Sequence, residues 1–234
     1  AREAAKIDAT ETLFLETGHK GMYVVVLGFY DDPARPIRYQ RVPLDGRFKE
    51  ADDVAALFAK YQKELESLGF SVLGIKALPT ADVRKFVGGE TCGDCHSKAY
   101  EIWENTPHAH ALDTLVHLTP PRQFDPECLA CHVTGWKPQK YVPFASGFAS
   151  IEKTPLLVAN GCENCHGPGS KHVEVEMGDL EVDAETRQKL RDQMKLPIAG
   201  DVAKNKCIEC HDIDNSPDFD FETYWPRIEH KGKN

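Results

Sequence analysis

One short pattern of reactive residues occurs four times in this chain, and the four copies contain all eight cysteines. In each copy two cysteines are separated by two residues, and the second is followed directly by histidine. Two thiols at this spacing can add across the vinyl groups of a porphyrin, and the adjacent imidazole can then bind the iron as the proximal ligand. The pattern therefore predicts four covalently attached c-type haems. The attachment residues would be Cys92, Cys95, Cys128, Cys131, Cys162, Cys165, Cys207 and Cys210, and the proximal ligands His96, His132, His166 and His211.

Two other uses of paired cysteines compete with this interpretation. Zinc ribbons also contain such pairs, because four thiolate or imidazole ligands complete a tetrahedral site. A zinc ribbon does not need a histidine after every second cysteine, whereas all four copies here have one. A disulfide framework would not repeat a two-residue spacing four times. The pattern therefore favours haem, with zinc as the main alternative.

Composition indicates how the haems would be used. Apolar residues make up 41% of the 234 residues, below the usual share of about 45–50%. From Glu90 onward the motifs are so closely spaced that side chains are too few for an ordinary core, so we expect porphyrins to form the interior. The net charge of −9 argues against nucleic acid or an anionic membrane surface as a partner, and favours a basic or neutral redox partner. There is no apolar run of 18 residues, so no membrane span is predicted.

The region before the motifs lacks cysteine and is predicted to be a separate small domain. Residues 22–30 are mostly β-branched and aromatic, which is typical of a buried strand. Residues 37–42 alternate apolar with polar, as in a strand with one solvent-exposed face. Between residues 50 and 67 the apolar residues fall at helical spacing, and Gly69 stands where a C-terminal cap belongs. We expect this helix to pack on the strands.

The predicted domain boundary follows from these elements. Residues 71–76 are a candidate short strand, and residues 77–85 are the expected linker. The predicted organisation is a haem-free α+β domain over residues 1–85, which docks or assembles, and a mainly α-helical, loop-rich multihaem domain with little regular sheet over residues 86–234.

Six histidines remain as candidates for the second axial positions: His19, His108, His110, His117, His172 and His230. Thr106 and Pro107 resemble an N-cap and first helical position, so a helix is predicted from there to about His117. On it His108 would share its face with an apolar stripe, Ala111, Leu112 and Leu115, suited to a porphyrin. His108 is therefore a ligand candidate, whereas His110 and His117 fall on the opposite face and are expected to be surface residues.

Two later histidines are also candidates. His172 follows the third motif too closely to reach the same iron, so it would serve a neighbouring haem; the alternative is a surface histidine in an acidic segment. His230 follows an aromatic cluster that could anchor the C-terminal segment against haem; the alternative is a histidine in a disordered tail. The aromatic residues are Phe219, Phe221, Tyr224 and Trp225. None of the three methionines has a comparable context, so methionine ligation is not expected.

The residues around these motifs resemble a known family. The segment 92–115 with Trp103, the run Cys128–Gly135, and the run Gly161–Gly169 are similar to the tetrahaem cytochrome c of ammonia-oxidising bacteria, which accepts electrons from hydroxylamine oxidoreductase. The resemblance covers about residues 90–234. It implies three bis-histidine haems and a five-coordinate second haem.

By position, the resemblance implies a ligand for three of the haems. His172 would complete the first haem, His230 the third and His108 the fourth, and the last of these agrees with the helical-face argument.

The sequence departs from the family in two places. The stretch between His211 and His230 is shorter and lacks the segment that covers the open face of the second haem. A front domain is present instead, with His19 in a glycine-flanked turn. His19 is therefore a candidate ligand of the second haem, from the same chain or from a neighbouring copy. In the second case the chain resembles extracellular cytochrome filaments, in which an N-terminal histidine joins successive subunits.

The sequence therefore predicts an extracytoplasmic electron carrier with four c-type haems. Its partners would be redox proteins or a terminal extracellular acceptor, with homopolymerisation through the front domain as a hypothesis. No secretion signal is recognisable at the start, so we expect a signal that has been removed or lies outside this sequence; the resemblance implies a periplasmic or extracellular location. The alternative function is an enzyme that reduces a small nitrogen oxide at a five-coordinate second haem.

Overall fold

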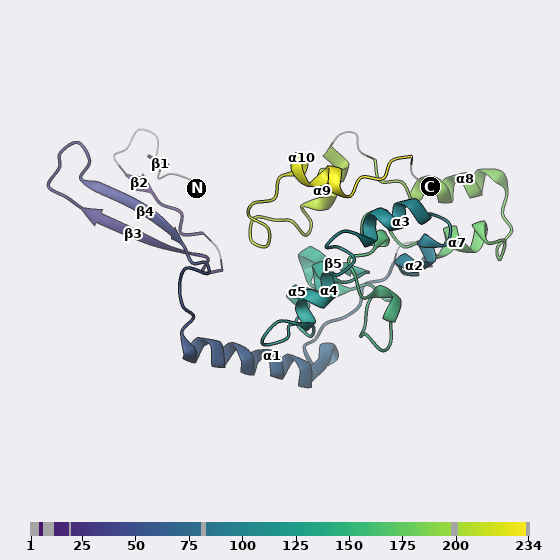
Figure 1. Cartoon of the computed structure of the whole chain (residues 1–234), viewed down its shortest axis with the longest axis horizontal. Coiled ribbons are helices and arrows are strands. Elements are labelled where there is room, and N and C mark those ends of the chain that lie inside the picture. The colour runs from purple at the N-terminus through teal and green to yellow at the C-terminus, as the bar shows by residue number, and fades with distance from the viewer. Residues whose placement is uncertain (1–4, 7–11, 19, 81–82, 198–200, 233–234) are drawn as a thin grey trace. The chain divides into compact units, whose positions relative to one another are not determined.

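A computed structural model describes residues 5–6, 12–18, 20–80, 83–197 and 201–232 (Figure 1). Backbone contacts divide the chain into two compact units, Ala1–Ala55 and Ala56–Asn234. The boundary expected near residue 85, between a haem-free and a haem-binding domain, stays a prediction. The division falls inside a helix that begins at Asp52, and the later residues of this helix contact the haem-motif region, as described below.

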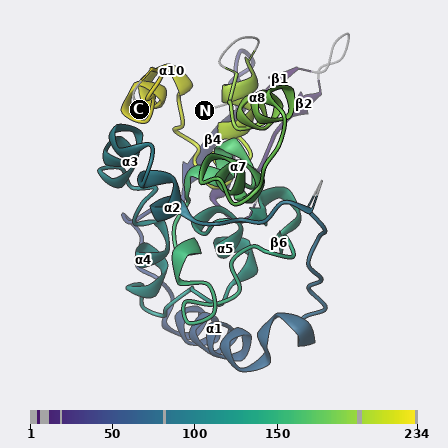
Figure 2. The same ribbon diagram turned by 90° about the vertical axis from the view of Figure 1, so that its right-hand side faces the viewer.

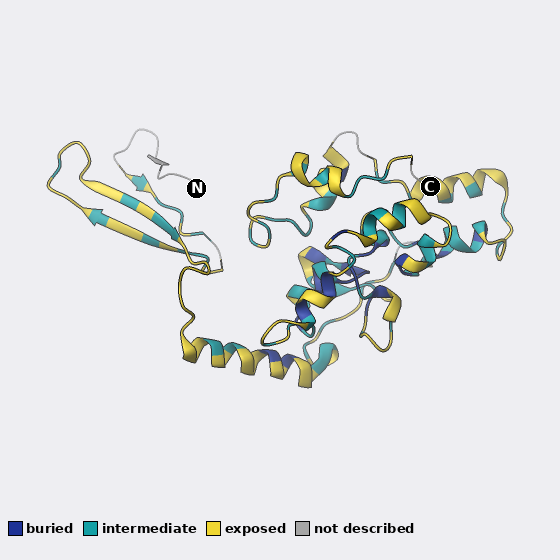
Figure 3. Cartoon of the chain, in the orientation of Figure 1, coloured by how far each residue is buried: buried dark blue, intermediate teal, exposed yellow. Residues whose placement is uncertain are grey.

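The first unit consists of short antiparallel strand pairs. Strands β1 (Ala5–Lys6) and β2 (Leu13–Phe14) pair with each other, and β3 (Tyr23–Phe29) forms a hairpin with β4 (Ile37–Pro43). The strands predicted over residues 22–30 and 37–42 are therefore confirmed. The expected burial of the first of them is wrong, since several of its apolar side chains are exposed (Figure 3). A two-stranded sheet buries a face only where another element covers it.

Helix α1 (Asp52–Val72) confirms the predicted helix and shows how the chain leaves it. Gly69 has a φ of 68°, the conformation expected of a C-terminal cap, and one further turn follows it. The strand proposed over residues 71–76 is wrong, because the amide of Gly74 donates to the Ser71 carbonyl and that of Ile75 to Phe70. These turn bonds use the backbone groups that a strand would need.

Within the second unit, α1 is attached to helix α5 (Pro126–His132) by a buried hydrogen bond. The Gln62 side-chain amide donates to a carboxylate oxygen of Asp125 at 2.8 Å. The other oxygen of Asp125 accepts from the backbone amide of Glu127 and so caps α5, and Pro126 occupies the first turn. One aspartate thus both begins the helix of the second motif and fixes α1 beside it.

The rest of the second unit is made of short helices joined by loops, as Figure 2 shows. The described part of this unit has one strand pair, β5 (Trp136–Lys137) with β6 (Val142–Pro143). The prediction of a helix-rich, loop-rich domain with little regular sheet is confirmed. The remaining α-helices are α2 (Gly89–Gly93), α3 (Ser97–Glu104), α4 (Ala111–Val116), α6 (Cys162–His166), α7 (Ser170–Glu176), α8 (Ala184–Gln193), α9 (Val202–Cys207) and α10 (Phe221–Tyr224). The 3₁₀ turns are Pro138–Lys140, Pro155–Leu157 and Trp225–Arg227. Within the described ranges, no helix has the length and apolar character needed to cross a membrane.

The start of α4 corrects one sequence prediction. The helix expected from Pro107 begins instead at Ala111, after turns over residues 107–110. Thr106 does not cap it, because its hydroxyl donates to the Trp103 carbonyl at 2.7 Å and so closes the preceding helix. The apolar stripe is nevertheless present, since Ala111, Leu112 and Leu115 are all buried.

The side-chain core of the second unit is small and lies around the second motif (Figure 3). Leu129 and Ala130, the two residues between its cysteines, are 0% and 1% exposed. The other buried members of this cluster are Leu112, Leu115, Val133, Trp136, Phe148 and Leu157. A core of eight side chains is small for a unit of this length, which agrees with the expectation that another group supplies interior volume.

Buried hydrogen bonds join the second motif to the third. The Thr134 hydroxyl, in a residue 1% exposed, donates to the Ala159 carbonyl at 2.7 Å and accepts from the Gly161 amide at 3.0 Å. The Asn164 side chain donates to the Val133 carbonyl and accepts from the Gly135 amide. These bonds fix the spacing between the two attachment motifs.

We expect Thr134→Val to test this junction. The substitution keeps the shape but removes both hydroxyl bonds, and a buried amide that loses its partner costs about 1–3 kcal/mol. Denaturant unfolding should show a loss in that range, whereas the exposed Thr186→Val should change stability by less than about 0.5 kcal/mol. Equal effects of the two substitutions would contradict the assignment.

Candidate haem-attachment sites

Each motif is positioned by a short helix. Cys92 lies in α2, the second motif occupies the end of α5, the third forms all of α6, and Cys207 ends α9. All eight cysteines are described, and none forms a disulfide. Within the described residues, no group of three or more histidine, cysteine, aspartate or glutamate side chains is arranged to hold a metal ion, as a zinc ribbon would require.

The cysteines of different motifs lie beside one another in pairs. The Cys92 thiol hydrogen-bonds with that of Cys162, which together with burial raises the pKa of Cys92. Cys210 forms the same kind of bond with Cys131. Cys165, whose pKa is raised to about 11 mainly by burial, also interacts electrostatically with Cys207. The first motif therefore adjoins the third, the third adjoins the fourth, and the fourth adjoins the second.

The structure brings together the three histidine pairs that the family resemblance implied. The ring centroids of His96 and His172 are 6.3 Å apart, those of His108 and His211 are 6.0 Å apart, and those of His166 and His230 are 5.7 Å apart. Imidazole nitrogens bind metal ions at about 2.0–2.1 Å, so two imidazoles on opposite sides of one ion have ring centres about 6 Å apart. All three spacings thus fit an iron between the rings. In the nearly parallel pair of His96 and His172, inclined at 22°, this distance exceeds van der Waals contact.

Hydrogen bonds leave the iron-binding nitrogens of several rings free. Nδ1 of His132 lies 2.6 Å from the Ala111 carbonyl oxygen, and Nδ1 of His166 lies 2.6 Å from that of Met194. Nδ1 of His230 lies 2.9 Å from the Ile228 carbonyl oxygen. A carbonyl only accepts, so Nδ1 carries the proton and Nε2 keeps its lone pair for a metal.

Burial also favours the neutral, metal-binding form of these imidazoles. The pKa values of His108, His166, His172 and His211 are all lowered, and in each case desolvation is the largest cause. A neutral ring needs no deprotonation before it binds iron. The proximal ring of the fourth motif is further held in place, because Phe219 stacks on His211 at 4.5 Å and the Ser216 hydroxyl lies 3.1 Å from its Nδ1.

The remaining histidines fall into two groups. His110 and His117 are exposed, in agreement with the expectation that they are surface residues. His19 lies outside the described residues. Among the described histidines, none has its ring opposite His132 in the way the three pairs face each other.

An arginine-bound carboxylate lies behind His172. Glu176 Oε1 is 3.9 Å from His172 Nδ1, and Arg191 binds both oxygens of Glu176 at 2.9 and 2.8 Å. The Arg191 hydrogen bond is the main reason that the pKa of Glu176 falls to about 2. Glu176 therefore carries its negative charge throughout the physiological pH range.

We expect Glu176→Gln and Arg191→Gln to shift the reduction potential of one haem in opposite directions. Removing the carboxylate charge makes the His172 imidazole a weaker donor to iron and raises the potential; removing the guanidinium charge lowers it. A spectroelectrochemical titration of both variants measures these shifts. The surface substitution Lys195→Gln is the control for the loss of a single charge, and shifts of the same sign in the first two variants would contradict the prediction.

Several residues that organise the sites were not predicted. Asn160 donates to the Cys131 carbonyl at 2.8 Å and its own backbone carbonyl accepts from the Trp103 indole at 2.9 Å, so it joins the second motif to helix α3, which follows the first motif. Glu163, between the cysteines of the third motif, is only 2% exposed and accepts three backbone amides. Burial raises the pKa of Glu163, and the bonds from Gly88, Gly169 and Val87 oppose that rise. The only signal in the sequence was an acidic residue inside an attachment motif.

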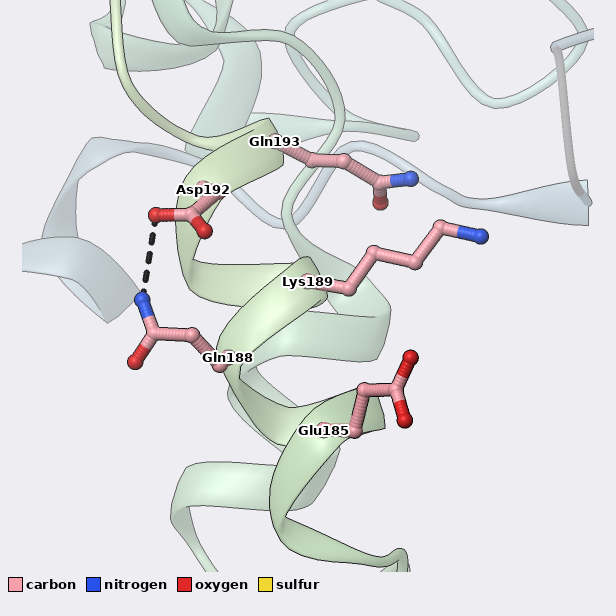
Figure 4. Close-up of a pocket in the computed structure, with 5 residues that line it drawn as sticks. All are labelled: Glu185, Gln188, Lys189, Asp192 and Gln193. Carbon is pink, nitrogen blue, oxygen red and sulfur yellow. Dashed lines mark hydrogen bonds between the residues drawn. The ribbon is translucent and has the colours of Figure 1, made fainter.

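One surface hollow lies along α8. Figure 4 shows that it is lined by polar side chains of that helix, and Gln188 donates to Asp192 at 3.0 Å. Its lining residues are Glu185, Gln188, Lys189, Asp192 and Gln193. These residues are exposed and contain no haem-binding group.

The repeated motifs and the facing imidazoles are the features of a multihaem c-type cytochrome. Residues 91–167 match the family described as cytochrome c554 and c-prime, so the predicted resemblance is confirmed over this part of the chain, and that family implies covalently bound c-type haem. Cytochrome c-554 of Nitrosomonas europaea is 33% identical over 97 residues, which cover 36% of this chain and 39% of that protein. The reduced-state structure of cytochrome c554 from the same organism is 23% identical, covers 64% of this chain and 84% of that chain, and has a TM-score of 0.36. A score this low does not establish a shared arrangement.

Proposed function

We propose that this protein carries electrons outside the cytoplasm through four covalently attached haems. The observation that supports this most strongly is the spacing of three histidine pairs at 5.7–6.3 Å between ring centroids. When bound, haem iron alternates between the ferric and ferrous states and so accepts and releases one electron. The relative in Nitrosomonas europaea is named a cytochrome, and the proposal extends that class to this chain.

In this proposal the chain's own residues determine what the haems can do. Two imidazoles on one iron leave no axial position for a substrate, which favours electron transfer over catalysis. The axial pairs would be His96 with His172, His166 with His230 and His211 with His108. Carbonyl groups fix the rings of His132, His166 and His230 through Nδ1. These rings would therefore keep the same orientation whether the iron is ferric or ferrous.

The order of the attachment sites suggests the order of the relay. The contacts between cysteines place the motifs in the sequence first, third, fourth, second. Haems attached at neighbouring cysteines would lie close to each other, so electron exchange between them would require no movement of the chain. The first and second motifs would then be the two ends of the relay.

The second motif needs a separate account, because its proximal histidine, His132, faces no described histidine. We propose that His19 supplies the second ligand, from the same chain or from a neighbouring copy. The exposed apolar side chains of β3, including Val24, Val26 and Phe29, would favour assembly through the first unit. In that case copies join into an extracellular filament; the alternative is a five-coordinate haem that reduces a small nitrogen oxide.

Counting spin states tests the proposal. The electron paramagnetic resonance spectrum of the ferric protein should integrate to four low-spin haems, and intact mass should exceed that of the polypeptide by four haems. His19→Ala should convert one haem to high spin. A native high-spin signal of one haem in four that shifts with nitric oxide would support the enzyme instead. Dispersed monomers by cryo-imaging, with an unchanged His19→Ala spectrum, would remove the filament.

A further inference from the structure

The buried carboxylate of the third motif binds two segments that lie outside that motif. Glu163 Oε2 accepts from the amide of Gly88 at 2.8 Å, and Oε1 accepts from the amide of Gly169 at 2.8 Å. The amide of Val87 lies 3.0 Å from both oxygens. One side chain therefore holds residues 87–88 and residue 169 against helix α6.

These two segments lead directly to the two histidines of one pair. Gly88 is the N-cap of α2, which begins the first motif and leads to His96. Gly169 is the N-cap of α7, which carries His172. The Glu163 carboxylate is thus the shared anchor of two helices, and the positions of those helices determine whether the rings of His96 and His172 face each other at 6.3 Å.

Two further contacts hold the same junction. The amide of Lys85 donates to the Ser170 hydroxyl at 2.9 Å, and the amide of Ser170 donates to the Lys85 carbonyl at 3.1 Å. Gly88 has a φ of 93°, and a Cβ there would lie 2.5 Å from the Leu156 carbonyl oxygen. Only glycine adopts this φ without strain and avoids the Leu156 carbonyl at this position.

We propose that Glu163 is a positioning residue for the first haem, although it belongs to the attachment motif of the third. It holds the His96 and His172 segments at the separation that places one iron between the two rings. The inference rests on the proposed axial pairing of these two histidines. In this inference a residue between the cysteines of the third motif controls the geometry of the axial ligands of the first haem.

Glu163→Gln should release one of the two segments. The side-chain amide of glutamine has one oxygen that accepts hydrogen bonds and one NH₂ group that only donates them. In either orientation the NH₂ group therefore faces a backbone N–H, which is also a donor, and no hydrogen bond forms between them. Either the Gly88 side or the Gly169 side is left unpaired in a buried site. The spectrum of the first haem should therefore change in its g-values, with partial conversion to high spin, while the spectrum of the third haem stays the same.

The experiment compares ferric paramagnetic resonance spectra of the haem-loaded protein. The low-spin component that disappears in His172→Ala is assigned to the first haem. The low-spin component that disappears in His230→Ala is assigned to the third haem. Glu163→Gln is then compared with Glu209→Gln, which makes the same chemical change between the cysteines of the fourth motif, where the carboxylate pairs with Lys137 and Lys206. We expect Glu163→Gln alone to alter the component that His172→Ala removes.

Two results would overturn the inference directly. A change confined to the component that His230→Ala removes would show that Glu163 serves its own motif, and an unchanged spectrum with lower stability would leave only a structural role. If Glu163→Gln does not accumulate as folded protein, Ser170→Ala loosens the same junction more mildly and should change the same component to a smaller extent. If His172→Ala itself removes no low-spin component, the proposed axial pairing fails, and the inference about Glu163 fails with it.

Discussion

Replacing both cysteines of the second motif, Cys128→Ser with Cys131→Ser, is expected to remove one haem and most of the stability of the second unit. Without thiols no covalent bond to the porphyrin forms, so intact mass should fall by one haem. A porphyrin that buries several hundred Å² of apolar surface contributes on the order of 10 kcal/mol at about 25 cal/mol per Å². The net stability of a domain is only about 5–15 kcal/mol. We therefore expect the variant to be largely unfolded, as measured by far-ultraviolet circular dichroism and denaturant titration.

The fourth motif provides the matched control for this experiment. Cys207→Ser with Cys210→Ser should also remove one haem, but its neighbour Ile208 is 43% exposed, whereas Leu129 in the second motif is fully buried. Loss of a peripheral haem leaves the cluster around α4 and α5 intact. Equal loss of stability in both variants would contradict the view that the second motif lies at the centre of the core.

The chemistry of the sites was predictable because it depends on local spacing. A thiol pair followed by histidine specifies its reaction within five residues, wherever those residues lie in the fold. The His108 prediction also rested on a local feature, the apolar stripe of Ala111, Leu112 and Leu115, and the stripe is buried although the helix begins four residues later than expected.

Features that depend on distant contacts were not predictable. The helix of residues 52–72 has the pattern of a partner for the strands before it. Its contacts are instead with residues far along the chain: Gln62 bonds to Asp125, 63 residues away, and Phe70 packs against Trp136. The role of Glu163 depends on amides 75 and 6 residues away in opposite directions. Periodicity and composition contain no information about such contacts, because both are properties of neighbouring residues.

His108→Ala is expected to convert one haem from low spin to high spin. The imidazole is half-buried, its centroid lies 6.0 Å from that of His211, and no other described histidine ring faces His211 in this way. Removing it leaves the iron with one protein ligand, so the ferric spectrum should lose one low-spin component in four, and the reduced protein should bind carbon monoxide at that haem. His108→Met should stay low spin and raise the potential of the same haem, since methionine favours the ferrous state relative to histidine.

His110 supplies the control for this substitution, because it lies two residues along the same segment and its side chain is 63% exposed. His110→Ala changes the same functional group without reaching an iron, so its spectrum and carbon monoxide binding should match those of the unaltered protein. Comparing His108→Ala with His110→Ala distinguishes the loss of an iron ligand from a general effect of removing an imidazole near α4. A high-spin signal from His110→Ala, or an unchanged spectrum from His108→Ala, would mean that the ring facing His211 is not its axial partner. The fourth haem would then take its second ligand from elsewhere in the chain or from another copy.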